Sequence, residues 1–246
     1  VALTLVLVVS AGLMIRTFHA LSDVDPGFSN PELIQIVRTW IPSTLFHDPA
    51  EYTRRQHEMV DRIAALPGIT AVGFSDAVPL EGSGVGADIS VEGQSAGAER
   101  RNGIKFVSPG YFQAMGTRIV VGPEVTWGDI EAGGRVVVIS ENYARELAGN
   151  PAGALGMRIR LTAYDKNPWR EIVGVVENAR ENGLHETSPS MVYWPVFAEE
   201  MYNNSTIGTP VATFAIRSER AGTAALVEEI RRATQSGSAS VPVAGE

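Results

Sequence analysis

The sequence contains no cysteine in 246 residues. It therefore has no disulfide bond, no thiolate nucleophile and no cysteine-based metal site. The absence of cysteine suits an oxidising compartment such as the periplasm, without requiring one. Lysine is nearly absent too, because the positive charges are almost all arginine and only Lys105 and Lys166 are lysines. We attribute this bias to genome composition rather than to function.

The balance of charge excludes one class of partner. The formal net charge is −8, whereas a domain that binds nucleic acid usually carries a basic face. Hydrophobic residues make up 44% of the chain and charged residues 20%, a composition typical of a folded domain with a packed core. After the apolar N-terminal run, about 225 residues remain, which suffice for one large or two small domains.

Charged side chains are missing from the start of the chain. Val1–Ile15 has none, Arg16 follows it, and from about Ser22 the composition is that of a soluble domain. No initiator methionine precedes this run. Its residues would reach about 22 Å as a helix, short of the roughly 30 Å hydrocarbon core of a bilayer. We expect residues 1–21 to be the C-terminal part of a truncated transmembrane helix whose first turns lie upstream.

Two other interpretations of the apolar run stay open. A signal peptide would have a basic segment and a small-residue cleavage site, and no lysine or arginine precedes Val1. A buried core helix would normally present polar residues on one face, and only Thr4 and Ser10 interrupt the run. Ser10, Ala11 and Gly12 are small enough to let a second membrane helix approach closely.

The first part of the soluble region predicts a turn, a strand, a helix and a strand. Residues 23–28 (DVDPGF) predict the turn, and the apolar pattern of residues 33–40 predicts the first strand. Residues 49–65 predict the helix, with Asp48 as its N-cap and proline at the first helical position. A Pro-Gly pair ends the helix before the next strand at 69–74. This arrangement is half of a ferredoxin-like fold.

The C-terminal part repeats that arrangement. Residues 211–217 predict a strand, residues 223–233 an amphipathic helix, and residues 241–243 the beginning of a closing strand. One βαβ half therefore lies near each end of the chain, which brings the termini together. We predict an α+β fold, in which a porter-like subdomain of two ferredoxin-like halves (30–80 and 210–246) carries an inserted mixed α/β subdomain (81–209).

The inserted region predicts several strands and two short helices. The helices are expected at residues 109–115, capped by Ser108, and at 140–148, capped by Ser140. Residues 82–86 (GSGVG) predict a flexible loop. The strands are expected at residues 87–91, 104–107, 135–139, 157–161, 171–176 and 191–195. The fourth and fifth of these strands are expected to pair across a polar turn.

Two motifs invite a catalytic interpretation. The GSGVG loop is similar to a phosphate-binding loop, which needs a helix directly after its glycines, but a strand pattern follows here. Ser75 lies in a GxSxA context close to a nucleophile elbow, which needs a following helix and a downstream histidine. No helix follows Ser75, and His185 is the only later histidine. A hydrolase that uses Ser75 or His185 remains an alternative.

We predict no catalytic, cofactor-binding or metal-binding residue. None of the histidines has the spacing of metal ligands. They are His19, His47, His57 and His185. The polar stretch 177–186 follows an apolar strand and is interpreted as a solvated turn, with a catalytic loop as the alternative. Trp169 and Trp194 are expected to pack, or to mark a partner surface where exposed.

A series of short motifs follows the apolar run in a fixed order and covers almost the whole chain. They are SAGLMIRTF (10–18), VDPGF (24–28), ALPGITAVG (65–73), AVPLEG (77–82), VSPGYFQAMG (107–116), VVVISENYARELA (136–148), ALGMRIRL (154–161), EIVGVVENARENGL (171–184) and TFAIR (213–217). Together they resemble the periplasmic region of MacB-type and FtsX-like ABC transporter permeases, and more closely the large duplicated permeases common in acidobacteria. Residues 122–134 depart from the family in lacking the arginine of a GRxF turn.

The resemblance implies an extracytoplasmic domain between the first two membrane helices of a permease repeat. Such a domain faces the periplasm from the bacterial inner membrane and is not catalytic. It contacts substrates or partner proteins and transmits motion driven by ATP that a separate cytoplasmic ATPase hydrolyses. The implied partners are that ATPase, a second permease copy in a dimer and a periplasmic adaptor. The alternatives are a membrane-anchored periplasmic enzyme and a single-pass sensor or scaffold domain.

Overall fold

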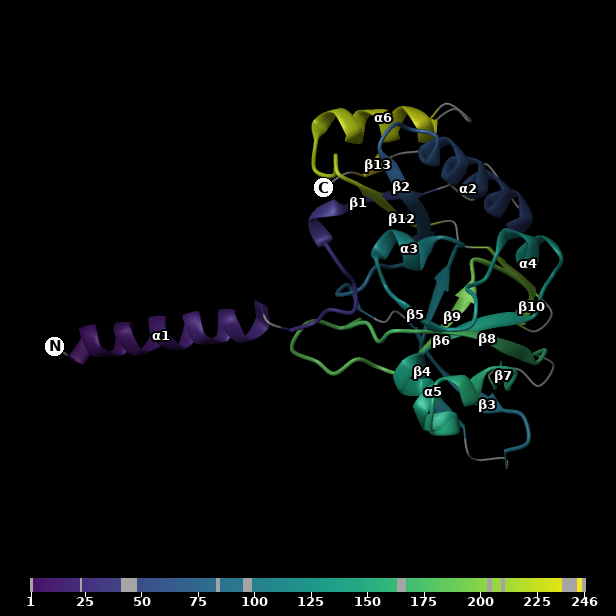
Figure 1. The fold of residues 1–246 in the computed structure, drawn as a ribbon, viewed down its shortest axis with the longest axis horizontal. Helices are drawn as coiled ribbons and strands as arrows, with labels where there is room; N and C mark the ends of the chain where they lie inside the picture. Colours follow the sequence, from purple (N-terminus) through teal and green to yellow (C-terminus); the bar gives the residue numbers. More distant parts are fainter. Residues whose placement is uncertain are drawn as a thin grey trace.

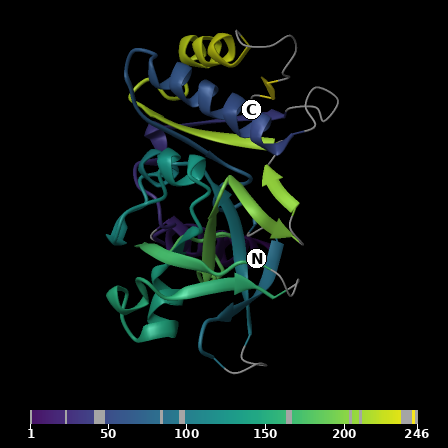
Figure 2. The same ribbon diagram turned by 90° about the vertical axis from the view of Figure 1, so that its right-hand side faces the viewer.

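The computed structural model describes residues 2–22, 24–40, 48–82, 85–94, 99–162, 167–202, 205–208, 211–235 and 243–244. A long N-terminal helix, α1 (Ala2–Ser22), projects away from a folded body (Figure 1). The body contains a sheet covered by helices and, beside it, a second group of strands (Figures 1 and 2). The α+β class predicted from the sequence is confirmed.

Helix α1 carries apolar side chains around its circumference. Leu7, Val9 and Ile15 are 62%, 53% and 60% exposed, and they lie on different sides of a helix with 3.6 residues per turn. Within the described part of the chain, we find no helix with both the length and the apolar character that crossing a bilayer requires.

The sheet with two helices is built from the two ends of the chain. Its strands, in spatial order, are β13 (Val243–Ala244), β1 (Ile34–Trp40), β12 (Val211–Ser218) and β2 (Ile69–Ser75). All neighbours are antiparallel. Helix α2 (Pro49–Ala64) connects β1 to β2, and α6 (Ala224–Gln235) connects β12 to β13. Each helix therefore joins two strands that have one other strand between them.

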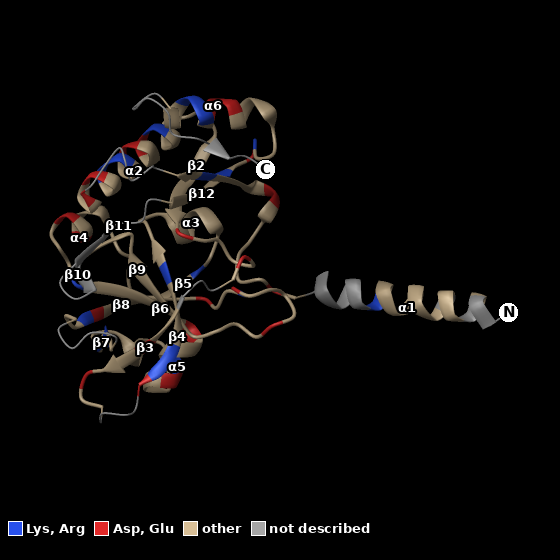
Figure 3. Ribbon diagram, turned by 180° about the vertical axis from the view of Figure 1, so that it is seen from behind, with Lys and Arg blue, Asp and Glu red and all other residues tan. Residues whose placement is uncertain are grey.

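Helix α2 begins and packs as its sequence predicts. The Asp48 carboxylate accepts a hydrogen bond from the backbone N–H of Ala50 at 2.9 Å, and proline occupies the first turn. Met59 and Ile63 are buried on one side of the helix, in the same core as Phe74 of β2. The opposite side of α2 carries alternating acidic and basic residues, as on α6 (Figure 3).

The second group of strands closes on itself. Its members are β3 (Val85–Val91), β4 (Arg100–Val107), β6 (Val136–Ser140), β7 (Arg158–Leu161), β8 (Arg170–Val176) and β9 (Met191–Pro195). The pairing runs β4-β3-β7-β8-β6-β9, and β9 also pairs with β4. We call this closed arrangement the ring. It continues into the first sheet through a single residue pair, Ser75 of β2 with Val107 of β4.

The ring has its own hydrophobic core. Ile104, Ile139, Ile172 and Trp194 belong to it and are almost fully buried. Helix α5 (Glu141–Ala148) contributes Tyr143 to this core. The expected packing role of Trp194 is therefore confirmed.

Smaller elements complete the chain. They are two 3₁₀ turns (Pro31–Leu33 and Ala152–Ala154), α3 (Tyr111–Met115), α4 (Trp127–Glu131), β5 (Ile119–Val121), and the hairpin of β10 (Phe197–Tyr202) and β11 (Ser205–Gly208). Strand β5 pairs with β8. Helix α4 occupies the segment that lacks the family's arginine turn, and a capping box of Thr126 and Asp129 stabilises its first turn.

Of two predicted helix caps, Ser108 is wrong and Ser140 is confirmed in position only. Helix α3 begins after Gly110, whose φ is 80°, and the Ser108 hydroxyl accepts the N–H of Phe74 in β2 at 2.8 Å. Ser140 does stand at the N-cap of α5, but its hydroxyl accepts the N–H of Met191 instead of a helix N–H. Both serines bind neighbouring strands because these helices pack directly on the sheets.

Other predictions have mixed outcomes. Strands β7 and β8 pair as expected, whereas β3 begins at Val85, inside the expected flexible loop. His47, turn residues 165–166 and residues 241–242 of the predicted last strand lie outside the described residues.

Candidate functional site: the junction between the sheet and the ring

Helix α3 packs tightly against the sheet where the sheet meets the ring. A Cβ atom on Gly73 of β2 would lie 2.3 Å from the backbone nitrogen of Tyr111. Contacts below about 3 Å between such atoms are repulsive, so only glycine lets the helix and strand approach this closely. The result is a compact junction formed by the ends of β2 and β4 and by α3.

A buried ion pair lies at this junction. The Lys105 ammonium on β4 contacts the Glu181 carboxylate, and each side chain is only 1% exposed. The Tyr193 hydroxyl on β9 donates to the other Glu181 oxygen at 3.4 Å. Tyr111 and Asp76 lie close enough to Lys105 to raise the pKa of its ammonium group. We call Asp76, Lys105, Tyr111, Glu181 and Tyr193 the junction cluster.

Burial and charge together set the protonation of the cluster. Burial alone would lower the pKa of Lys105, but the facing Tyr111 and Glu181 outweigh it and raise that pKa above its ordinary value. Burial raises the pKa of Tyr193 well above its ordinary value, and Glu181 adds to the effect. Lys105 is therefore a cation and Tyr193 a neutral donor over the physiological range.

The loop that carries Glu181 bonds to three other parts of the chain. The N–H of Arg180 donates to the carbonyl of Pro26, in the turn after α1, at 2.9 Å. The N–H of Gly82, after β2, donates to the carbonyl of Glu181 at 2.8 Å. The N–H of Asn142, in the first turn of α5, donates to the Asn178 side chain at 2.8 Å. The prediction of a solvated turn over residues 177–186 is therefore wrong at Glu181, which is fully buried.

A cleft of about 420 Å³ lies between α2, α4 and the beginning of β10. The His57 ring of α2 stacks on the Trp127 ring of α4, with centroids 3.8 Å apart. The carboxylates of Asp61 and Glu131 lie 3.9 and 4.0 Å from the two imidazole nitrogens. Phe197 completes the apolar part of the lining. This cleft could accommodate a small apolar or aromatic group.

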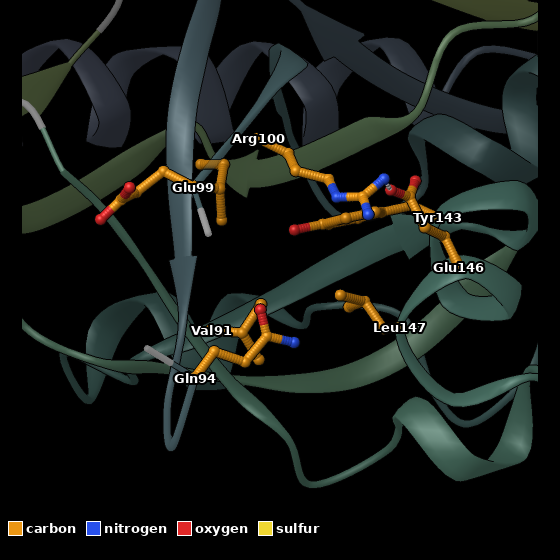
Figure 4. A pocket seen from close by; sticks show the side chains of 8 residues that line it. Val91, Gln94, Glu99, Arg100, Tyr143, Glu146 and Leu147 are labelled. Atoms are coloured by element: carbon orange, nitrogen blue, oxygen red, sulfur yellow. Dashed lines mark hydrogen bonds and ion pairs between the residues drawn. The ribbon is translucent and has the colours of Figure 1, made fainter. Parts of the chain in front are cut away.

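A second hollow of about 330 Å³ lies between β3, β4 and α5. In Figure 4 the Arg100 side chain points toward Glu146, with which it forms an ion pair, and Tyr143 lies beside them. Burial raises the pKa of Tyr143 to about 12, so its hydroxyl stays protonated. The lining is mostly polar and the ion pair is accessible to solvent.

The residues of the hydrolase alternative do not form a catalytic arrangement. The Ser75 hydroxyl is buried and donates to the carbonyl of Ala77. The His185 side chain is 74% exposed, and its ion-pair partner is the adjacent Glu186 at 3.7 Å. A nucleophile and its base need hydrogen-bond contact. No such contact joins Ser75 to His185 among the described residues.

The other histidines give no metal site within the described ranges. His57 stacks on Trp127, and His19 lies on α1. Trp169, whose packing role was predicted, is partly buried and lies under the guanidinium of Arg160, 4.6 Å from its ring centroid. Sequence reasoning missed Lys105, and it placed Glu181 in the polar stretch 177–186 without predicting its burial. The only available signal was a lysine within an otherwise apolar strand, flanked by Ile104 and Phe106.

Similar folds occur among solved structures of transporter domains. The periplasmic region of MacB from Actinobacillus actinomycetemcomitans is 15% identical, with a TM-score of 0.51 over 89% of this chain and 90% of that one. A domain of a putative permease protein from Porphyromonas gingivalis is 18% identical, with a TM-score of 0.51 over 85% of both chains. The extracellular domain of the noncanonic ABC-type transporter YknZ from Gram-positive bacteria is 17% identical, with a TM-score of 0.50 over 86% of this chain and 98% of that one.

Identities this low show the shared fold only. No curated protein matches the sequence. The family model of the MacB-like periplasmic core domain, however, matches residues 1–233. That match spans the turn after α1, the ring, the junction cluster and the first sheet up to β12. The chain therefore belongs to the family of MacB-like periplasmic core domains of ABC-type transporter permeases.

Proposed function

We propose that this domain is a non-catalytic part of its permease that contacts substrates or partner proteins and transmits ATP-driven motion. A separate cytoplasmic ATPase hydrolyses the ATP, and the domain faces the periplasm from the inner membrane. The observation that carries this proposal is the continuous bonding from the turn after α1, through Arg180 and Asn178, to the ring. A domain that conveys movement needs such a connection between its membrane end and its body.

In this proposal residues 1–21, most of which form α1, are the C-terminal part of a transmembrane helix. Support comes from Val6, Leu7, Met14 and Ile15, which expose apolar surface on different sides of the helix. A helix that is apolar all round is usually buried in a protein core or a membrane, and α1 projects away from the body in Figure 1.

The body corresponds, in the same proposal, to a porter-like subdomain (30–80 and 210–246) with an inserted subdomain (81–209). The strand order β13-β1-β12-β2 supports the ferredoxin-like assignment, because each strand–helix–strand unit encloses one strand of the other unit. The ring, α3, α4 and α5 all come from the inserted segment.

The proposed partners are the ATPase, a second copy of the permease and a periplasmic adaptor. The cleft between α2 and α4 is a candidate contact surface, because it combines the aromatic rings of Trp127 and Phe197 with the charges of Arg54 and Glu131. Aromatic and arginine side chains are enriched at protein interfaces.

The experiment uses the full permease with its ATPase, reconstituted in lipid. These 246 residues contain no cysteine, so Glu171→Cys introduces the single labelling position of this domain, on the exposed face of β8. Any cysteine elsewhere in the permease and its ATPase is replaced first. A spin label there reports the distance between two permease copies. We expect this distance to differ between the nucleotide-free state and the state trapped with ATP and vanadate.

An intramolecular label pair serves as the control. Asn150→Cys with Glu171→Cys places both labels on the ring side of the domain, so their distance should be the same in both states. If the distance between copies is also the same in both states, the domain does not transmit ATP-driven motion.

The hydrolase alternative is not proposed. It would require Ser75 and His185 to act together, whereas the first is buried and the second is exposed. Purified protein with Ser75→Ala should therefore behave as the wild type in every transport assay, apart from a change in stability.

A further inference from the structure

We propose that residues 177–182, here called the strap, couple the turn after α1 directly to the ring, and that the Lys105–Glu181 ion pair is the latch that holds the strap in place. The part of this inference that concerns transmission of motion through the strap rests on the proposed function. The latch itself is a property of this chain and is testable without transport.

The strap is fixed from inside the junction. The Glu181 side chain is 1% exposed, contacts the Lys105 ammonium and accepts from the Tyr193 hydroxyl at 3.4 Å. Both partners lie on neighbouring strands of the ring, β4 and β9. A buried carboxylate without a cation is strongly unfavourable. Loss of the Lys105 charge therefore favours opening of the strap, which lets the Glu181 carboxylate reach water.

The backbone of the strap binds the turn after α1. The N–H of Arg180 donates to the carbonyl of Pro26 at 2.9 Å, and its Nε donates to the carbonyl of Asp25 at 3.3 Å. A Cβ atom on Gly27 would lie 2.1 Å from the carbonyl oxygen of Asn178. The turn and the strap thus touch backbone to backbone, with glycine as the residue that permits the contact.

The same strap also binds the chain that leaves β2. The N–H groups of Leu80 and Gly82 donate to the carbonyls of Arg180 and Glu181 at 3.1 and 2.8 Å. Leu80 has φ of 73°, a conformation that is unfavourable for a residue with a side chain and persists where surrounding bonds impose it. The strap supplies one of those bonds.

This arrangement gives α1 two routes to the body. One route runs through β1 into the sheet, as chain connectivity requires. The other runs from Pro26 to Arg180 in the strap, and it reaches the ring without passing through the sheet. The strap follows β8 in the chain, and the Glu181–Lys105 contact fixes its far end to β4. Replacing a buried ion pair by apolar residues often preserves stability, so the pair's role here is to fix the strap's position.

The test is hydrogen exchange of the full chain, wild type against Glu181→Gln and Lys105→Met. The reporters are the backbone amides of Leu80, Gly82 and Arg180, which bond to or from the strap. We expect their exchange to be at least about tenfold faster in both variants, as expected for local opening of a bonded segment. The amide of Glu92, bonded to Arg158 in the ring, should exchange as in the wild type.

Glu92→Gln is the matched control, because it removes the same charge from an exposed ion pair with Arg158. It should leave the three reporter amides unchanged. Glu181→Gln keeps the size of the side chain, so it decides the question if Lys105→Met fails to fold. If the reporter amides stay protected in folded Glu181→Gln protein, the ion pair does not act as a latch. The same conclusion follows if exchange becomes faster by the same factor at amides throughout the ring.

A second measurement separates the latch from the proposed function. In the full permease, Glu181→Gln should reduce the ATP-dependent change of the Glu171→Cys distance between copies, because the strap is then no longer fixed to β4. If the distance between copies of the wild type is the same with and without ATP, the proposed function is contradicted. The role of the Lys105–Glu181 pair as a latch is tested by hydrogen exchange alone.

Discussion

At the scale of residues, buried charge dominates the junction. Lys105 and Glu181 have lost nearly all contact with water, and their mutual contact and the Tyr193 hydroxyl replace it. Sequence patterns cannot anticipate such a pair, because its members are 76 positions apart and each type of side chain is usually exposed. The Asp48 cap, in contrast, was predictable because its partner is two residues away.

Lys105→Met should lower the free energy of unfolding by about 3–5 kcal/mol, because it leaves the Glu181 carboxylate buried without a cation. Adding Glu181→Leu should recover most of that loss, since the uncompensated charge is then removed. Urea denaturation of the single and double variants measures both effects. Glu92→Gln, in the exposed pair with Arg158, should change stability by about 0–1 kcal/mol. A double variant as unstable as Lys105→Met would contradict this account.

Alkaline pH should weaken the fold through the same cluster. Although burial opposes it, the pKa of Lys105 is raised from its ordinary value of 10.5, so the folded state binds this proton more tightly than the unfolded state. The contribution of Lys105 is complete below that ordinary pKa and is lost as pH rises through the raised value. The raised pKa of Tyr193 acts in the same direction above its ordinary value of 10.0.

Urea midpoints measured from about pH 8 upward test this dependence. The midpoint of the wild type should fall as pH passes 10 to 10.5, and that of Lys105→Met should fall less. Equal slopes would show that Lys105 keeps no raised pKa in the folded protein.

At the scale of elements, the close packing of α3 on β2 depends on glycine. Gly73→Ala should destabilise the protein by about 1–3 kcal/mol, because the new methyl group meets backbone atoms of Tyr111 that cannot rotate away. Gly128→Ala, in α4, is the matched control. Its new Cβ meets only the Thr126 hydroxyl at 3.6 Å, so it should be neutral or stabilise by up to about 1 kcal/mol. Thermal unfolding compares the two; equal losses would refute the packing argument.

Helices and strands were predictable from the sequence where residues close together in the chain determine them. The N-cap and periodicity of α2 and the paired strands β7 and β8 follow from residues near in sequence. The hairpin β10–β11, strand β5 and helix α4 were not predicted, because they are short and have weak periodicity. Ser108 and Ser140 have the right residue type for caps, yet strands packed nearby compete for their hydroxyls.

At the scale of the whole molecule, α1 should determine where the protein partitions. The full chain should float with lipid vesicles, and a chain that begins at residue 24 should stay in the aqueous phase. Leu7→Lys with Met14→Lys should reduce flotation strongly, because each charge costs about 2.5–3.5 kcal/mol in the hydrocarbon core. Glu186→Lys, on the exposed loop, is the control and should not change it. Flotation of the shortened chain would contradict the anchoring role of α1.

The arrangement of the two sheets was only partly predictable. Repetition of strand, helix and strand at the chain ends indicated how β1, β2 and β12 assemble. The closure of the ring was not predicted, since it depends on β4 pairing in parallel with β9, which lies almost 90 residues later. Such long-range register leaves no signature in a single sequence.

Closure of the ring has a consequence for how other polypeptides can bind. Among the described residues, each of its six strands has a bonded neighbour on both sides, so none presents the row of free N–H and C=O groups on which a foreign strand can add. The inserted region is thereby protected from aggregation by strand addition. A partner that extends a sheet of this protein would therefore add outside the ring, beside β13 at the outer margin of the four-stranded sheet or beside the hairpin of β10 and β11.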